Sequence, residues 1–576
     1  MRFQLIVLLA LVLLPTADAA KQGRIKLLAA KEGLNGTFVG STADLFLEIQ
    51  EGSGRVFLDT FPLTKVDTQI STRFAKEVAC NYLDYACDGY DFIYTIRADS
   101  SIIGGPSAGA AAAALTVALL DGITINQDIA ITGTINSGGV IGPVGGILAK
   151  IDAAKEGGAA VVLVPKGEGG QKSGNSSIDA REYGENLNIT VIEVSSLDEV
   201  LSYYTGVSIP EIDNVSADQG YQEAMRQISE RFCNRSSQLG KNLDEKDQSV
   251  SRGRNLTLRG EEAMKLGDFY SAASYCFGAN VQFTAASLLG QNLSAGELLD
   301  LVKQGEKSVR DFGSRISKEE KKTLTDLQSS MIIRERLDES RDVFTKARLQ
   351  LLNGTQPYQD IAYGFERIYT ASAWSVFFNH QGRAYDLDPD KIKDACINKL
   401  LEVEERMQYI SLVFPVQQEN DDLKYANADY EKKDYEMCLF RASKAKASAD
   451  IIMAVLGLED GPAVDDVIEQ KLRAAKKSLA RQAKKGIFPI LAYSYYEYAN
   501  SLKTQDRYSS LLFAEYSLEL SQLDAYFKEK KAYAGFSLDT EKVEIFLLGL
   551  AVGIGSLSLG RIIAERKRKH VERRFL

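Results

Sequence analysis

Hydrophobic residues follow two different patterns along the chain, and the change comes near residue 204. Before it, short runs of β-branched and aromatic residues alternate with helical stretches, which is typical of an α/β domain. The expected strands are LFLEI (45–49), FIYTIRA (92–98), DIAITGTI (128–135), AVVLVP (160–165) and ITVIEV (189–194). We therefore predict an α/β domain over residues 20–204.

The second pattern begins after residues 205–220, a segment with Pro, Gly and acidic residues that we interpret as a linker. Apolar residues are then spaced three and four apart in runs rich in Ala, Leu, Glu and Lys, which predicts an all-helical region over 221–540. A sequence pattern recurs at 260–279, 425–445 and 498–518. In each copy, a polar turn and an aromatic residue precede an amphipathic helix. The pattern predicts helical hairpins that loosely resemble tetratricopeptide repeats.

Two strongly apolar segments lie at the ends of the chain. Residues 1–19 combine a charged start, an apolar run and small residues up to Ala19, which is typical of a secretory signal peptide. An N-terminal membrane anchor is the alternative, although the run is shorter than the ~20 residues that a span needs. Residues 543–563 are apolar and precede a basic tail, 564–576. They predict one C-terminal transmembrane helix with its tail in the cytoplasm; a buried core helix is the alternative.

The termini therefore predict a single-pass protein of the cell membrane with the bulk of the chain outside the cytoplasm. A net charge of -10 argues against a nucleic-acid partner. N-glycosylation motifs fall in the predicted exterior part, at Asn35, Asn175, Asn188, Asn214, Asn234, Asn255, Asn292 and Asn353.

Six cysteines also lie in the predicted exterior part, where disulfides persist. The similar spacings from Cys233 to Cys276 and from Cys396 to Cys438 predict that each of these pairs staples a helical hairpin. Four unrelated buried cysteines are the alternative. Cys80 and Cys87 are close enough along the chain for a local disulfide, with free thiols as the alternative.

The candidate chemistry begins in IIGGPSAGAAAAALTVALL (102–120). Ser107 is expected at the start of an Ala-rich helix, where backbone N–H groups and the helix dipole stabilise negative charge. A nucleophile and an oxyanion site would then share one place, with Gly105 and Ala108 as supporting residues. A strand-to-helix turn without chemistry is the alternative.

A serine nucleophile needs a base, and the chain holds only two histidines, His380 in the helical half and His570 in the basic tail. A Ser-His-Asp triad is therefore implausible. A lysine serves as the base when burial and neighbouring hydroxyl groups keep it uncharged. Lys150 is the candidate; Lys155 and Lys166 are nearby alternatives, better interpreted as surface lysines.

These motifs together resemble a known family. GGPSAG, followed by TGTINSGGVIGPVGGILAK and then VLVPK, closely resembles the proteolytic domain of Lon peptidases, and the resemblance extends over roughly residues 25–204. It implies that Ser107 is the nucleophile, that Lys150 is the general base and that the Thr132 hydroxyl hydrogen-bonds the lysine. The chain departs from the family at Gly104, where an acidic residue is usual, and in a polar insertion around Asn175.

The sequence contains no GxxxxGKS or GxxxxGKT phosphate loop, so the ATP-driven unfoldase of ordinary Lon is missing. The arrangement is similar to predicted archaeal secreted Lon-like serine proteases. The expected fold is thus an α/β Lon-type proteolytic domain, then an all-α helical-repeat-like region and one C-terminal transmembrane helix.

The expected function is that of an ATP-independent serine endopeptidase, without cofactor or metal, that cleaves unfolded or loosely folded polypeptides at the outer face of the membrane. One alternative is a ring-forming Lon-like scaffold with weak activity, whose helical half recruits protein partners. A third interpretation gives the helical half an adhesive role. Assembly into a homo-oligomeric ring is implied by the resemblance alone.

Overall fold

The computed structural model describes residues 20–32, 38–61, 64–98, 105–167, 170–173, 176–207, 219–244, 246–378, 382–413, 420–455 and 461–530. The α/β part consists of β1 (Lys21–Glu32), β2 (Phe38–Glu51), β3 (Val56–Phe61), α2 (Val66–Leu83), η1 (Cys87–Gly89), β4 (Tyr90–Ala98), η2 (Pro106–Ala108), α3 (Gly109–Asp121), β5 (Ile129–Ile131), β6 (Thr134–Asn136), η3 (Ser137–Gly139), β7 (Val140–Gly142), α4 (Ile147–Glu156), β8 (Val161–Pro165), β9 (Gly170–Ser173), β10 (Ser176–Asp179), α5 (Ala180–Asn186), β11 (Thr190–Val194) and α6 (Leu197–Thr205).

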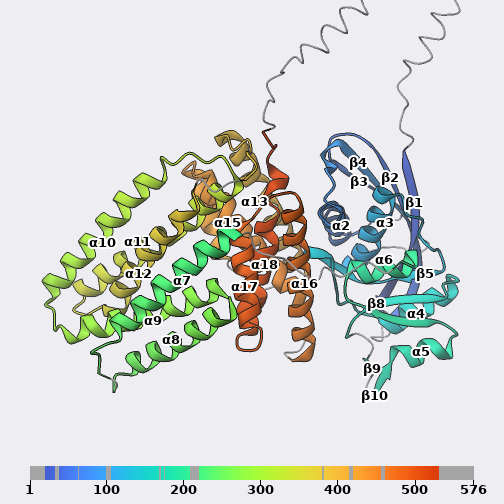
Figure 1. Ribbon diagram of the computed structural model, residues 1–576. Coiled ribbons are helices and arrows are strands. Elements are labelled where there is room, and N and C mark those ends of the chain that lie inside the picture. The colour runs from blue at the N-terminus through green and yellow to red at the C-terminus, as the bar shows by residue number, and fades with distance from the viewer. Residues whose placement is uncertain are drawn as a thin grey trace, which may run out of the picture. The chain divides into compact units, whose positions relative to one another are not determined.

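A seven-stranded mixed sheet in the order β11-β8-β5-β1-β2-β4-β3 forms the centre of this part (Figure 1). Strands β1, β5, β8 and β11 run parallel, whereas β2 is antiparallel to both of its neighbours, β1 and β4. All five expected strands are present, and DIAITGTI forms two, β5 and β6. Strands β1, β3, β7, β9 and β10 were not predicted.

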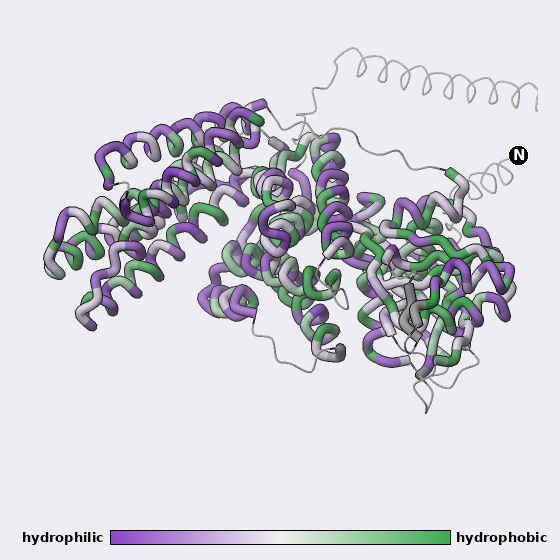
Figure 2. Tube along the Cα trace, turned by 90° about the horizontal axis from the view of Figure 1, so that it is seen from below, coloured by the Kyte–Doolittle hydropathy of each residue, from purple (hydrophilic) through white to green (hydrophobic). Residues whose placement is uncertain are grey.

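Successive side chains of each strand point to opposite faces of the sheet, and both faces are apolar. Ile131 and Leu163 belong to a core with α2, α3 and α6, whereas Ala130, Val162 and Val164 belong to a core with α4 and α5. Figure 2 shows hydrophobic residues concentrated along the strands of the sheet. The α3 helix, which begins just after Ser107, is buried along almost its whole length because its alanines pack closely against the sheet.

The rest of the described chain is helical. It consists of α7 (Gln219–Leu239), α8 (Gln248–Leu266), α9 (Phe269–Gly290), α10 (Ala295–Ile316), α11 (Leu324–Leu352), α12 (Tyr358–Trp374), η4 (Ser375–Phe377), α13 (Pro389–Val413), α14 (Asp421–Glu431), α15 (Tyr435–Val455), α16 (Pro462–Lys484), α17 (Ile490–Leu502), α18 (Arg507–Ser521) and η5 (Leu523–Tyr526). The three copies of the recurring sequence pattern form helical hairpins, α8–α9, α14–α15 and α17–α18. In each hairpin the two helices pack together. The predicted α/β domain followed by an all-helical region is therefore confirmed.

Three disulfides are formed, Cys80–Cys87, Cys233–Cys276 and Cys396–Cys438. The predicted pairing is confirmed, but the two long-range bonds do not close the hairpins. Each joins the second helix of a hairpin to an earlier helix, α7 to α9 in one case and α13 to α15 in the other. They therefore fix the packing of three consecutive helices.

The structure corrects one element of the predicted fold class. Among the described residues, no helix is both long and apolar enough to cross a membrane. The fold of the described chain is an α/β domain followed by a helical region, without a transmembrane helix. Residues 543–563, where that helix was expected, lie outside the described residues, as do 1–19 and 564–576.

The helical region packs directly against the α/β part, and contacts group the chain up to Lys528 into one unit. Helices α13, α15, α16 and α18 supply this contact, against α2 and the hairpin formed by β6, η3 and β7. The helical region therefore contacts the hairpin that adjoins the candidate site.

Candidate active site

Ser107 lies in η2, a short 3-10 turn that leads directly into α3, so the serine precedes the α-helix instead of forming its first residue. The turn is half-buried. Gly105 precedes it with φ 111°, a backbone conformation that favours glycine. Ala108 occupies the cap position of α3. Gly104, where the sequence departs from the Lon pattern, lies outside the described residues.

Backbone hydrogen bonds tie this turn to the segment after β5. The Gly133 N–H donates to the Ser107 carbonyl at 3.1 Å, and the Ala110 N–H donates to the Gly133 carbonyl at 3.1 Å. The Thr132 N–H in turn donates to the Leu163 carbonyl of β8 at 3.0 Å. Ser107 and Thr132 are therefore held next to each other by the main chain, independently of their side chains.

Lys150 lies in the first turns of α4 and is only 4% exposed. Its Nζ donates to the Thr132 hydroxyl oxygen at 3.1 Å. Gly146 caps the helix in the left-handed conformation, with φ 70°, and its carbonyl accepts from the Lys150 N–H at 3.0 Å. The flanking Ile147 and Ile151 are fully buried on the sheet, so the helix directs Lys150 into the protein.

The structure thus brings Lys150 and Thr132 into contact and places Ser107 beside Thr132 through Gly133. The two alternative lysines lie elsewhere. Lys155 is exposed, and its amine donates a hydrogen bond to the Leu187 carbonyl. Lys166 is half exposed and pairs with Asp466 at 3.0 Å. His380 and His570 lie outside the described residues.

A small hairpin joins Thr132 to Lys150. β6 follows Gly133, the η3 turn forms the tip, and β7 leads back toward α4. The two strands pair with Thr134 opposite Gly142, Ile135 opposite Ile141 and Asn136 opposite Val140. The start of α3 packs on this hairpin so closely that a Cβ on Gly109 would lie 3.1 Å from the Ile135 nitrogen. The hairpin is therefore joined to Thr132 and Lys150 along the chain and packs against the start of α3 beside Ser107.

Side chains of the helical region hold the tip of this hairpin, a feature that sequence reasoning missed. The Ser137 hydroxyl donates to Glu515 Oε2 at 2.8 Å and accepts from Lys471 Nζ at 2.9 Å. Lys471 of α16 and Glu515 of α18 form an ion pair, and both are fully buried. They lie 334 and 378 positions from Ser137 in sequence, so no local signal connects them.

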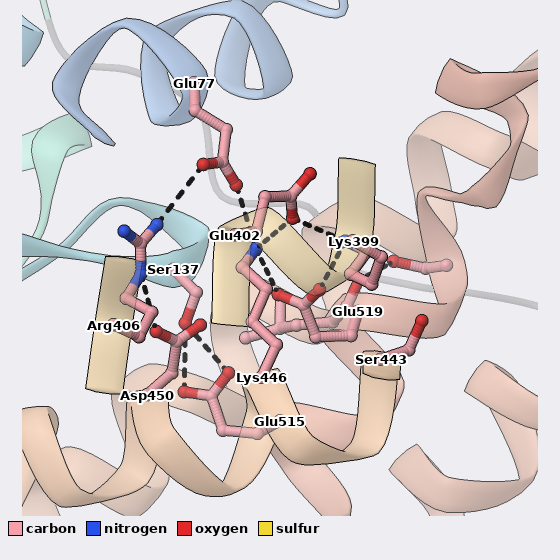
Figure 3. A network of polar contacts seen from close by, with 12 residues as sticks. Glu77, Ser137, Lys399, Glu402, Arg406, Ser443, Lys446, Asp450, Glu515 and Glu519 are labelled. Carbon is pink, nitrogen blue, oxygen red and sulfur yellow. Dashed lines mark hydrogen bonds and ion pairs between the residues drawn. The ribbon is translucent and has the colours of Figure 1, made fainter. Parts of the chain in front are cut away.

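A larger network of buried charges continues from this point (Figure 3). Glu77 of α2 accepts from Lys446 Nζ at 2.8 Å and from Arg406 Nη2 at 3.2 Å. Lys446 also pairs with Glu519 at 2.9 Å. Burial lowers the pKa of Lys446, but Glu519, Glu77 and Glu402 offset this and hold the pKa well above its ordinary value. Lys446 is therefore charged.

Comparison with known proteins agrees with the geometry. Residues 99–205 match the model of the Lon protease (S16) C-terminal proteolytic domain. A Lon protease of Clostridium beijerinckii is 29% identical over 190 residues, which cover 32% of this chain and 22% of that protein. A Lon protease of Azospirillum brasilense is 37% identical over 101 residues, 17% of this chain and 12% of that protein. An archaeal Lon protease of Pyrococcus abyssi is 38% identical over 97 residues, 17% of this chain and 9% of that protein.

The matched region carries the Lon-type proteolytic domain, as the motifs predicted. The chain nevertheless spans less than a quarter of the length of these relatives. The family match ends at residue 205, the last residue of α6, and so does not include the helical region that contributes Lys471 and Glu515.

Proposed function

We propose that this protein is an ATP-independent serine endopeptidase in which Ser107 is the nucleophile and Lys150 the general base. The observation that carries the proposal is the buried amine of Lys150, which donates to the neutral hydroxyl of Thr132 next to the Ser107 turn. A lysine can accept a proton only in its uncharged form, and an apolar site with hydroxyl partners favours that form. The match of residues 99–205 to the Lon proteolytic domain supports the same chemistry.

The proposed reaction is ordinary acyl transfer. Lys150 takes the proton of the Ser107 hydroxyl, and the serine oxygen attacks the peptide carbonyl to form a tetrahedral intermediate. The intermediate expels the amine of the leaving peptide, which takes up the proton from Lys150. Water, deprotonated by Lys150 in its turn, then hydrolyses the ester and releases the second peptide. Thr132 keeps the Lys150 amine in place through both steps.

The oxyanion requires backbone donors, and some of the amides near Ser107 are already used. The Gly109 N–H donates to the Pro106 carbonyl, and the Ala110 N–H donates to the Gly133 carbonyl. The Ala108 N–H belongs to the hydrogen bonding of the 3-10 turn itself, in which it faces the Gly105 carbonyl. We therefore assign the oxyanion donor to the amide of Ser107. Gly105 allows the turn to adopt its unusual backbone conformation just before Ser107.

The proposed substrates are unfolded or loosely folded polypeptides, and the proposed location is outside the cytoplasm. The substrate class is supported by the absence of a phosphate-binding loop from the sequence, because a folded substrate would need a motor to unfold it. The location is supported by the three disulfides, since such bonds persist in oxidising compartments.

The test is to incubate the purified protein with an unfolded protein substrate, with and without ATP, and to identify products by mass spectrometry. We expect internal cleavages at equal rates in both cases. Ser107→Ala is the control and should give no products. Cleavage that required ATP, or that persisted in Ser107→Ala, would contradict the proposal. A wild-type protein that left every unfolded substrate intact would favour the scaffold alternative.

A further inference from the structure

The contact between the helical region and the tip of the β6–β7 hairpin is a buried ion pair that is hydrogen-bonded to a serine hydroxyl. Ser137, Lys471 and Glu515 form a closed set in which the Ser137 hydroxyl both accepts from the amine and donates to the carboxylate. Lys471 Nζ also lies 3.3 Å from the Ser137 carbonyl oxygen. At Gly138 the backbone approaches α16 so closely that a Cβ would lie 2.6 Å from the Ala474 side chain.

Stability alone does not explain a buried ion pair at this place. Desolvation of two charges costs several kcal/mol, and replacement of such a pair by apolar residues is often neutral or stabilising. What a buried, fully hydrogen-bonded pair provides is a defined geometry, because each partner is satisfied in only one arrangement. Here that arrangement fixes where the hairpin tip lies relative to α16 and α18.

The hairpin can transmit this constraint to the candidate site because its two ends carry the site. Thr132 precedes β6 by two residues, and β7 leads through the Gly146 cap to Lys150 on α4. On the serine side, Gly133 is hydrogen-bonded to the Ser107 carbonyl, and Gly109 packs on Ile135 of β6. A shift of the tip would therefore move the Thr132 hydroxyl, the Lys150 amine and the Ser107 turn relative to one another.

We propose that Lys471 and Glu515 are positioning residues and that the helical region, by holding Ser137, completes the active geometry of the Ser107–Lys150 pair. This inference rests on the proposed peptidase function. It assigns the helical region a direct role in turnover, through a hydrogen-bonded clamp on the hairpin, in addition to any role in substrate capture.

The test uses the full chain and three substitutions in this clamp. Ser137→Ala removes the hydroxyl that both partners bind, and the double variant Lys471→Met with Glu515→Gln removes both charges together, so that no unpaired charge remains buried. For each we expect kcat for a peptide substrate to fall about 10- to 100-fold with little change in KM, since small misplacements of catalytic groups have effects of this size. The rate at which a fluorophosphonate probe labels Ser107 should fall in the same proportion.

Two further variants separate positioning from loss of structure. Ser137→Thr retains the hydroxyl and should restore most of the turnover that Ser137→Ala loses. Lys485→Met breaks another contact between α16 and the α/β part, the ion pair of Lys485 with Asp84, without touching the hairpin. It should keep wild-type kcat. Thermal unfolding of every variant is recorded alongside.

The outcomes distinguish the two proposals. If wild type shows turnover that Ser107→Ala lacks, while Ser137→Ala and the double variant stay within about twofold of wild type, the positioning role is wrong and the peptidase function stands. If Lys485→Met loses as much kcat as the clamp variants, the effect is a general loss of the contact, and the assignment to Lys471 and Glu515 is overturned. A wild type without turnover dependent on Ser107 removes both proposals.

Discussion

The two regions of the molecule both bury lysine side chains, and the described partners of these lysines differ: a hydroxyl in one region and carboxylates in the other. In the α/β domain, the amine of Lys150 donates to a neutral hydroxyl, that of Thr132. In the helical region, Lys399 and Lys446 lie between the carboxylates of Glu402 and Glu519. Burial lowers the pKa of Lys399, but these carboxylates more than offset the effect and raise the pKa well above its ordinary value.

The comparison shows that burial by itself does not make a lysine a base. Desolvation disfavours the ammonium form of a buried lysine, and neighbouring carboxylates more than offset this for Lys399 and Lys446. A carboxylate within hydrogen-bond distance stabilises the ammonium, which then holds structure together. The role proposed for Lys150 needs the opposite case, and a hydroxyl suits it because it accepts a hydrogen bond without adding charge. For the lysines of the helical region, the neighbouring carboxylates therefore affect the pKa more than burial does.

The largest expected effect concerns Lys150 itself. Lys150→Ala and Lys150→Arg should each lower turnover at least about 1000-fold, as Ser107→Ala does, and the double variant should be scarcely worse, because the two residues act as one unit. Arginine fails because a guanidinium does not lose its proton at accessible pH. The measurement is kcat/KM for a peptide substrate.

Lys155→Ala is the matched control, since Lys155 lies on the same helix and is exposed. It should keep wild-type activity. Appreciable turnover in Lys150→Arg that Ser107→Ala lacked would show that the serine uses another base, and the contrast between the two regions would lose its functional meaning.

Removal of a charged lysine in the helical region should lower the free energy of unfolding. Lys446→Met leaves Glu77 and Glu519 without their shared cation in a buried site, which should cost about 3–5 kcal/mol of unfolding free energy. Thermal or urea unfolding measures the effect. Lys484→Met, an exposed site on α16, should change stability by less than about 0.5 kcal/mol. Equal stability of the two variants would contradict the structural role of Lys446.

A smaller effect is expected at the hydroxyl that distinguishes the Lys150 site. Thr132→Val keeps the shape of the side chain but removes the acceptor of the lysine hydrogen bond. Loss of one buried hydrogen bond of about 1–3 kcal/mol corresponds to a decrease in kcat of roughly 10- to 100-fold. Thr132→Ser retains the hydroxyl and should keep most of the activity. If valine and serine behaved alike, the hydroxyl would have no part in holding the base.

The effect that develops most gradually is a pH dependence of stability in the helical region. Burial raises the pKa of Asp450 to about 7, although Arg406 and Lys446 oppose the shift. The folded state therefore keeps a proton that the unfolded state releases near pH 4. The stability gained from this proton is present in full below about pH 4 and is lost as the pH rises to about 7.

Asp450→Asn should abolish this dependence. Between pH 5 and 7, wild type should lose about 1 kcal/mol per pH unit relative to Asp450→Asn, and above pH 8 the difference should stay constant. Melting temperatures of the two proteins across this range provide the measurement. A difference that did not change with pH would show that Asp450 is already ionised in the folded state at pH 5.

Much of the fold and of the candidate site followed from local patterns. Alternating and helical periodicity predicted the five strands and the three hairpins, because burial of one face imposes the period on the sequence. The GGPSAG and GGILAK motifs predicted Ser107 and Lys150 as partners, and the structure brings Thr132 and Lys150 into contact. Strands β7, β9 and β10 were missed because three or four residues carry too little periodicity, and the longer strands β1 and β3 were missed as well.

Only the tertiary structure decided what the helical region does to the site. In the sequence, Lys471 and Glu515 stand on ordinary amphipathic helices, where charged residues usually face water. They are buried because α16 and α18 pack on the tip of a hairpin more than 300 residues earlier in the chain. The hydrophobic periodicity of a helix predicts which of its faces is buried, but it does not predict which segment packs against that face. A charge satisfied by a distant partner is therefore invisible until the two segments are seen together.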